Sequence, residues 1–292
     1  MKKQTDSRPG AFPSARDILT ETRRLLNTPA RLRFRLMLAL LCVLCITLGP
    51  ILILDCLLYV PDYADGPAAD VIFLCGQILQ AGCALFVGLP AAAAVFRVSA
   101  LTAAGQTDDD PDGASDAPYA SGWALAGAAL SDSLWCFSSP AAYAACLKTA
   151  GAFIAWLAWI CLFPAGCVCL FIFGEDITTA LPLTETGTVL LGIAAVLVTV
   201  GLTFVMLLLS GSPASYGYAL FTGSRSCPFV RVLWAPRGTR RTLLLLRLRM
   251  TGRYILSILL VLVPLFLIAI PCGMTAGAVY GRASAGLSHT ES

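Results

Sequence analysis

Histidine and charged side chains are scarce in this sequence. It holds one histidine, His289, and charged residues make up 13% of its 292 residues, against about 25% in a soluble domain. Long apolar stretches therefore run without a charge near their middle. Proton relays in membranes depend on buried carboxylates or histidines, so this scarcity argues against an ion-coupled pump. It also leaves no histidine pair for a zinc-dependent peptidase.

Motifs for nucleotide binding and hydrolysis are missing as well. The sequence contains no glycine-rich phosphate loop and no serine nucleophile elbow. The longest segment outside the apolar stretches is about fifty residues, too short for a separate soluble catalytic domain. We therefore expect no enzyme activity, no catalytic residue, no cofactor and no metal site.

Hydrophobic residues are abundant instead, at 58% of the chain, and the mean hydropathy is +0.79. They gather in five stretches, each long enough to cross a bilayer core, which takes about 20 helical residues. These stretches are residues 36–60, 71–96, 149–173, 188–210 and 254–280. The sequence predicts an all-α fold, a polytopic transmembrane helix bundle of five spans with amphipathic interfacial helices on the cytoplasmic side.

Polar segments divide the chain around these spans. Residues 1–35 form a basic cytoplasmic N-terminal segment with an amphipathic helix, and residues 36–280 form the transmembrane domain. Within that domain, residues 105–118 are an acidic linker without large aliphatic side chains, which predicts disorder. Residues 225–253 are a basic cytoplasmic segment. Residues 281–292 form an external tail.

The basic residues are distributed unevenly. Nine precede the first stretch, two flank the loop between the second and third, and eight precede the fifth. With a cytoplasmic N-terminus, nineteen of the twenty Lys and Arg residues share one side, and only Arg282 falls opposite. The positive-inside rule thus predicts a multi-pass protein of the cytoplasmic cell membrane, with the N-terminus cytoplasmic and the C-terminus external.

Three segments beside the spans have the spacing of amphipathic helices: residues 13–27, 121–139 and 228–250. In the first, Ser14 can cap the helix and Asp17 can complete a capping box. Such helices lie in the membrane interface or pack on the bundle, and the sequence leaves both readings open for the first segment.

Four arginines cluster within about a third of the helical circumference at 100° per residue. We assign lipid binding to this set, with anionic headgroups as partners: Arg237, Arg240, Arg241 and Arg247. A nucleic-acid surface is the alternative, but no aromatic side chains alternate with these arginines and no recognition fold is present. We therefore expect lipids, and a membrane-protein partner, rather than nucleic acid.

Gln77 and Gln80 form the strongest polar pair at depth in the second stretch. Their spacing places them on roughly one helix face. Hydrogen bonding between helices is the simpler explanation of such a pair, and a polar lining of a pore or lipid path is the functional one. The twelve cysteines are expected to be free thiols packed between helices.

A weak internal repeat precedes and enters the odd-numbered spans. Each of these spans carries a proline at a similar depth, namely Pro50, Pro164 and Pro264, and a short segment with leucine or tryptophan and a proline precedes each. The predicted unit is an interfacial helix followed by a hairpin of two spans, with the third copy truncated after one span.

The overall plan resembles a broad group of uncharacterised bacterial polytopic integral membrane proteins. The resemblance rests on the basic amphipathic segment at residues 16–26 and on the basic segment at 237–253 before a late span. The acidic linker and the missing sixth span depart from that plan. The resemblance implies a cytoplasmic-membrane protein and supplies no site residues.

Three classes of function remain open. The favoured one is a structural or accessory protein that binds lipids or partner proteins through basic interfacial helices. The alternative is a permease-like subunit of a transporter energised by a separate ATPase. A membrane enzyme acting on lipids is the third, and the missing motifs argue against it.

Overall fold

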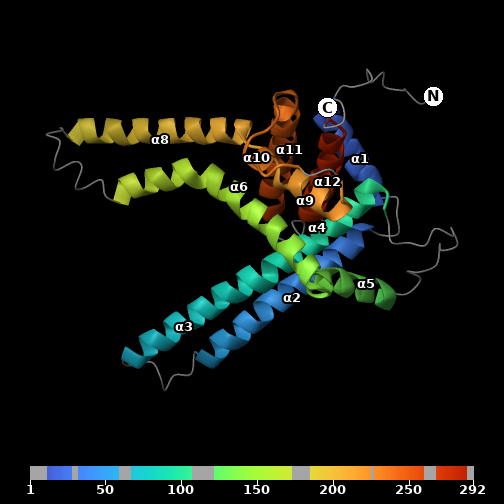
Figure 1. Ribbon diagram of the computed structural model, residues 1–292. Helices are drawn as coiled ribbons and strands as arrows, with labels where there is room; N and C mark the ends of the chain where they lie inside the picture. Colours follow the sequence, from blue (N-terminus) through green and yellow to red (C-terminus); the bar gives the residue numbers. More distant parts are fainter. Residues whose placement is uncertain are drawn as a thin grey trace.

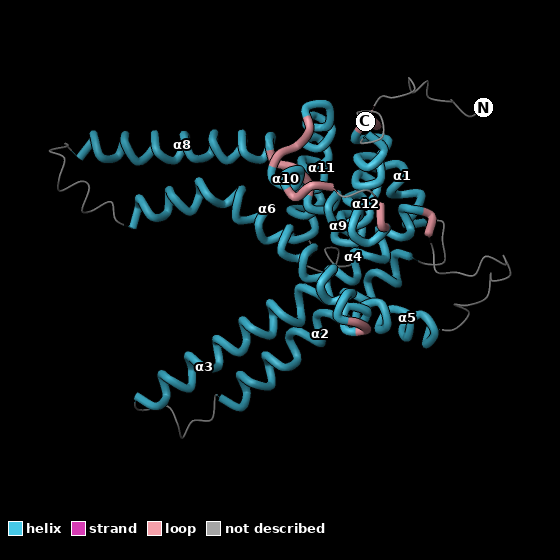
Figure 2. The backbone as a smooth tube through the Cα atoms, in the orientation of Figure 1, coloured by secondary structure: helices cyan, strands magenta, loops and turns pink. Residues whose placement is uncertain are grey.

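The computed structural model describes residues 12–27, 32–58, 67–106, 122–172, 185–224, 227–259 and 268–287. The regular structure in these ranges is helical, and they contain no strand (Figure 2). Four helical stretches are long and apolar enough to cross a membrane: Leu32–Pro50, Leu74–Ala104, Pro140–Cys169 and Thr186–Thr222. The predicted all-helical fold is confirmed for the described residues, with four helices of the length and composition of membrane spans, and the fifth predicted span is not among the four.

The helices follow one another in three units, each with a short helix and then a longer hairpin (Figure 1). The first unit contains α1 (Ala15–Asn27), α2 (Leu32–Leu58), α3 (Pro67–Cys83), the π-helical turn η2 (Ala84–Gly88) and α4 (Leu89–Ala104). The second contains α5 (Gly122–Leu134), η3 (Trp135–Phe137), α6 (Pro140–Ile172), α8 (Glu185–Leu209) and α9 (Pro213–Thr222). The third contains α10 (Val230–Leu233), η4 (Arg237–Thr239), α11 (Arg240–Leu259) and α12 (Ile270–Leu287).

Local sequence explains several helix ends. Ser14 and Asp17 form the predicted capping box: the Ser14 hydroxyl accepts from the Asp17 N–H, and the Asp17 carboxylate accepts from the Ser14 N–H at 3.1 Å. Gly105 and Gly223 end α4 and α9 with φ of +74° and +64°. Only glycine adopts this left-handed conformation without strain, so these residues terminate their helices.

Three helices, the second arms of the three units, form the centre of the fold. α4, α9 and α12 all contact one another. Small residues permit this approach, because Gly273, Gly277 and Gly281 lie four residues apart on one face of α12. A Cβ on Gly277 would lie 2.8 Å from the Ala214 Cβ, and one on Gly281 would lie 2.6 Å from the Tyr218 Cβ. Glycine is therefore required where α12 meets α9.

Contacts between the units close into a ring. The short helix of each unit packs on the hairpin of another: α5 on α2, α10 on α6, and α1 on α11 and α12. The second arm of each hairpin contacts the first arm of the next unit, as α4 with α6, α8 with α11, and α12 with α2. This cyclic pattern agrees with the predicted repeat of a short helix plus a hairpin.

The third unit differs from its predicted form. The stretch 254–280 was expected to be one span, but its described residues belong to two helices, α11 and α12. These run antiparallel, because Arg253 donates to the Cys272 sulfur at 2.8 Å, while Arg247, earlier in α11, lies near Tyr280, later in α12. The single fifth span and the truncated third copy are thus incorrect for the described residues, since α12 returns along α11.

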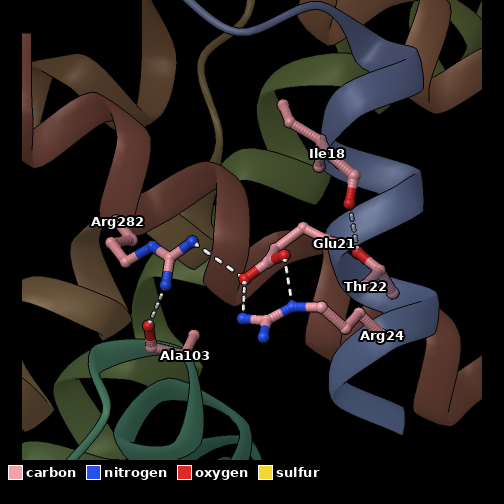
Figure 3. A network of polar contacts seen from close by, with 6 residues as sticks. All are labelled: Ile18, Glu21, Thr22, Arg24, Ala103 and Arg282. Atoms are coloured by element: carbon pink, nitrogen blue, oxygen red, sulfur yellow. Dashed lines mark hydrogen bonds and ion pairs between the residues drawn. The ribbon is translucent and has the colours of Figure 1, made fainter. Parts of the chain in front are cut away.

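The end of α12 lies against α1 and α4. The Arg282 guanidinium donates to the Ala103 carbonyl at 2.7 Å and to the Glu21 carboxylate at 3.4 Å, and Glu21 also binds Arg24 (Figure 3). Because Glu21 and Arg282 touch, they lie on the same side of any membrane. The predicted pair of a cytoplasmic N-terminal segment and an external residue 282 is therefore inconsistent with this contact.

The amphipathic segments pack on the rest of the chain. Ile18 and Thr22 of α1 are 1% and 0% exposed against the third unit, which favours the packing alternative for this helix. The third segment is split, because the chain is extended at Trp234 between α10 and η4. An interfacial position of these helices stays a prediction.

The outer parts of the hairpins expose apolar side chains. The α2–α3 and α6–α8 hairpins extend from the core in two directions (Figure 1). Leu79 of α3 is 60% exposed and Leu197 of α8 is 66% exposed. Monomeric soluble proteins rarely expose apolar patches of this extent, so these surfaces are suited to contact with lipid chains.

Candidate functional site

A cavity of about 450 Å³ lies where the three units meet. All three central helices line it through their first turns, together with α6, α11 and the break between α8 and α9. Its size falls in the range of about 300–1,000 Å³ that is usual for ligand sites. It is the best candidate for a functional site in the described part of the chain.

The walls of the cavity are mainly apolar. Aromatic and aliphatic side chains cover them, including Leu89, Phe96, Phe153, Trp156, Leu243 and Met274. Phe96 and Phe153 meet edge to face with ring centroids 6.3 Å apart, which fixes the wall between α4 and α6. Such a lining favours the apolar part of a ligand over a fully hydrated one.

Arg247 is the one guanidinium in the described lining of the cavity. It extends from α11 to the C-terminal end of α8, where it donates to the carbonyls of Leu207 and Gly211 and to the Ser210 hydroxyl, the last at 2.8 Å. Its guanidinium carbon lies 5.2 Å from the centre of the Trp156 ring. These contacts hold a long, flexible side chain in one place.

The end of α8 explains why an arginine is held there. The last carbonyls of a helix have no partner within the helix and carry partial negative charge, so a cation is stabilised beside them. Arg247 supplies these carbonyls with donors while it sits away from water. Burial lowers the pKa of Arg247 to about 10, which still leaves the guanidinium charged at neutral pH.

The remaining polar groups of the cavity are mostly donors. Ser212 precedes α9 in an extended conformation, and its carbonyl accepts from the Ser215 N–H at 3.2 Å, but its side chain makes no capping bond and leaves the Ala214 N–H without one. The buried indole nitrogen of Trp156 also lacks an acceptor among the described residues. No Asp or Glu is found in the described lining. The site is thus positive and rich in donors.

The structure separates the four predicted lipid-binding arginines. Arg237 and Arg241 are exposed, and Arg240 is half-buried and donates from Nε to the Ala235 carbonyl at 3.0 Å. Arg247 instead points into the cavity region. The four do not share one surface, because α11 begins only at Arg240 and the spacing of a single helix does not extend back to Arg237. Lipid binding by the outer arginines stays a prediction.

The two glutamines lie elsewhere. Gln77 is exposed on α3 and Gln80 is half-buried there, and neither lines the cavity. A polar path through them stays a prediction, without support from the cavity. The eleven described cysteines are unpaired. Within the described ranges, no group of three or more His, Cys, Asp or Glu side chains is placed to hold a metal ion.

Two contacts that position the units were not foreseen from the sequence. Arg35 of α2 forms an ion pair with Asp132 of α5, with bonds of 2.6 and 3.0 Å, and joins the first unit to the second. The Arg97 guanidinium lies 4.1 Å from the centre of the Trp135 ring. The sequence did hint at these contacts, because a single charged residue in an otherwise apolar segment indicates a polar or aromatic partner nearby.

No family model, no curated protein and no solved structure matches the chain.

Proposed function

We propose that this chain is a non-enzymatic accessory protein of the cytoplasmic membrane that binds an amphiphilic lipid in its central cavity. One observation carries the proposal: a mainly apolar cavity of about 450 Å³ is built by all three units and contains a fixed cation. Apolar walls with few, well-placed polar groups are typical of ligand sites. The missing nucleotide and hydrolase motifs favour binding over catalysis.

The distribution of charge supports a cytoplasmic position for the cavity. With α1 on the cytoplasmic side, its contact with Arg282 brings the end of α12 to that side as well. All twenty Lys and Arg residues then lie on the cytoplasmic side, whereas the topology predicted from the sequence places nineteen of them there. The cavity lies near the ends of the spans that carry these residues. It is then level with the headgroups of the cytoplasmic leaflet.

The exposed arginines contribute a second, weaker attraction for lipid. Arg237 and Arg241 lie outside the cavity, and basic residues near an anionic membrane surface contribute about 1 kcal/mol each, screened by salt. They would raise the local concentration of anionic lipid beside the cavity. The permease alternative receives no comparable support, since the two glutamines of α3 lie away from the cavity.

Retention of lipid by the purified protein tests the proposal. Ala92 lines the cavity, so Ala92→Phe should fill part of it, whereas Ala144→Phe on the exposed face of α6 should not. Native mass spectrometry of the detergent-solubilised protein should show one retained lipid that Ala92→Phe loses and Ala144→Phe keeps. Equal retention by both variants, or none by the unaltered protein, would refute cavity binding.

A further inference from the structure

The polar chemistry of the cavity indicates what part of a lipid it would recognise. Its one charged group is positive, and the described lining contains no carboxylate to neutralise it. The oxygens that Arg247 bonds are two carbonyls and one hydroxyl, none with a full charge. These bonds replace part of the lost hydration of the guanidinium and leave its charge in place.

Arg247 has donors to spare. A guanidinium carries five N–H groups, and three of them are used by the bonds to the end of α8. The other two have no acceptor among the described residues. A charged acceptor makes the strongest bonds with a guanidinium, so an acidic group is the ligand that these two N–H groups favour.

Two further groups of donors lie beside Arg247. The first turn of α9 begins at Pro213, which has no N–H, and the Ser215 N–H donates to the Ser212 carbonyl at 3.2 Å, so the donor of this turn that remains beside the cavity is the N–H of Ala214. Trp156, whose ring lies under the guanidinium, has an unpartnered indole N–H. Donors from α6, α9 and α11 therefore surround one end of an apolar cavity.

Resting on the proposed lipid binding, we propose that the ligand is an amphiphile with an anionic head, whose acid oxygens bind Arg247 and the neighbouring N–H groups of Trp156 and Ala214. Its chain lies along the wall formed by Phe96, Phe153 and Met274. The shared chemistry is a carboxylate or phosphate attached to a long alkyl chain. A free fatty acid and the phosphate of a membrane phospholipid both present it.

A series of amphiphiles with the same chain and different heads tests this assignment in the unaltered protein. Radiolabelled hexadecanoate is bound to the detergent-solubilised full chain, and unlabelled competitors are compared at equal mole fraction in the micelle. Hexadecyl phosphate should compete at a concentration at least tenfold below that of hexadecanol, a difference of about 1.4 kcal/mol. Hexadecyltrimethylammonium should compete least, because it adds a like charge.

One more competitor, a membrane phospholipid, distinguishes the two sources. Diacyl phosphatidylglycerol that displaces hexadecanoate at lower mole fraction than hexadecanoate itself would identify a membrane phospholipid as the ligand. The reverse order would identify a free fatty acid. Both orders support the anionic head, and equal competition by hexadecanol and hexadecanoate would overturn it.

Variants then assign the selectivity to Arg247. Arg247→Gln should raise the half-maximal concentration of hexadecanoate at least tenfold and leave that of hexadecanol unchanged. Arg249→Gln, on the exposed face of the same helix, is the matched control and should change neither. Because Arg247 also caps α8, Arg247→Lys provides a variant that keeps the charge, and it should retain the preference for acid heads. Loss of binding to all heads alike would overturn a role in head recognition.

Failure of this inference can be separated from failure of lipid binding itself. If Ala92→Phe removes saturable binding but all heads compete equally, the cavity binds lipid chains and the assigned head is wrong. If no competitor shows saturable binding that Ala92→Phe reduces, both proposals are wrong.

Discussion

Replacement of Gly281 by alanine should loosen the contact between α12 and α9. A Cβ at this position would lie 2.6 Å from the Tyr218 Cβ, 3.0 Å from the Tyr218 Cγ and 3.3 Å from the Ala214 carbonyl oxygen. Carbon atoms pack best at about 3.5–4.0 Å, so the two helices must move apart by roughly 1 Å. The Tyr218 Cβ is fixed to its helix and cannot rotate away, so the strain falls on the helix contact.

The magnitude follows from two opposing effects. Overpacking of this kind costs about 1–3 kcal/mol, while alanine gains up to about 1 kcal/mol over glycine in a helix. Gly286 lies on the same helix with nothing within 4 Å of a Cβ, so Gly286→Ala is the matched control. Gly281→Ala should therefore be less stable than Gly286→Ala by about 1–3 kcal/mol.

Thermal unfolding in detergent, followed with a thiol-reactive fluorophore, measures this difference. Cys136 is fully buried, and burial raises the pKa of its thiol, so it should react only once the fold opens. Each kcal/mol should shift the apparent midpoint by about 2–4 °C at one scan rate. Equal midpoints for the two variants would refute the close contact between α12 and α9.

Three further outcomes are expected. A reporter fused after Leu287 should read cytoplasmic together with a reporter at the N-terminus, and an external reading would refute the placement of α12 beside α1. Removal of one partner of the part-buried Arg35–Asp132 pair, as Arg35→Met or Asp132→Leu, should destabilise the folded protein by about 1–3 kcal/mol. The double variant should recover part of this loss. Additive losses in a double-mutant cycle would contradict the pairing. The hydrogen bond from Arg24 lowers the pKa of Glu21, so the ionised Glu21 contributes to stability at neutral pH, and this contribution is lost as the pH falls below the ordinary value of 4.5. Glu21→Gln should therefore reduce the fall of the unfolding midpoint at acid pH. Parallel pH profiles of the variant and the unaltered protein would show that Glu21 contributes nothing.

Several elements of the fold follow from local sequence. The capping box at the start of α1, the glycine after α4 and the long apolar helices depend on residues near in sequence, so their pattern is sufficient to predict them. Each of these features is decided within one helix or one turn.

The return of α12 along α11 depends on distant residues. A hydropathy profile measures the length of an apolar stretch but does not show where the chain reverses direction. Residues 254–280 were therefore predicted to form one span. The reversal places Gly273, Gly277 and Gly281 against α9 and α11, far away in the sequence. The sequence did contain a signal, since glycines every fourth residue are typical of closely packed membrane helices. Arg282, the only basic residue on the predicted outer side, was a second one.

The candidate site was missed for a similar reason. Arg247 was grouped with its sequence neighbours by angular spacing, whereas its partners are on α8, about forty residues earlier, and on α6. The cavity itself is lined by residues from five helices of three units. Spacing along one helix does not reveal which side chains from other helices meet there.

The contact of α1 with α11 and α12 gives the fold a circular order. The first and last described helices are neighbours, so going around the core leads from the third unit back into the first. A chain rearranged to begin at the second unit and end with the first would keep the same neighbours, provided that a linker joins the old ends. Adjacent ends are what makes circular permutation tolerable in other folds. In this molecule the order of the units around the core therefore does not depend on which unit comes first in the sequence.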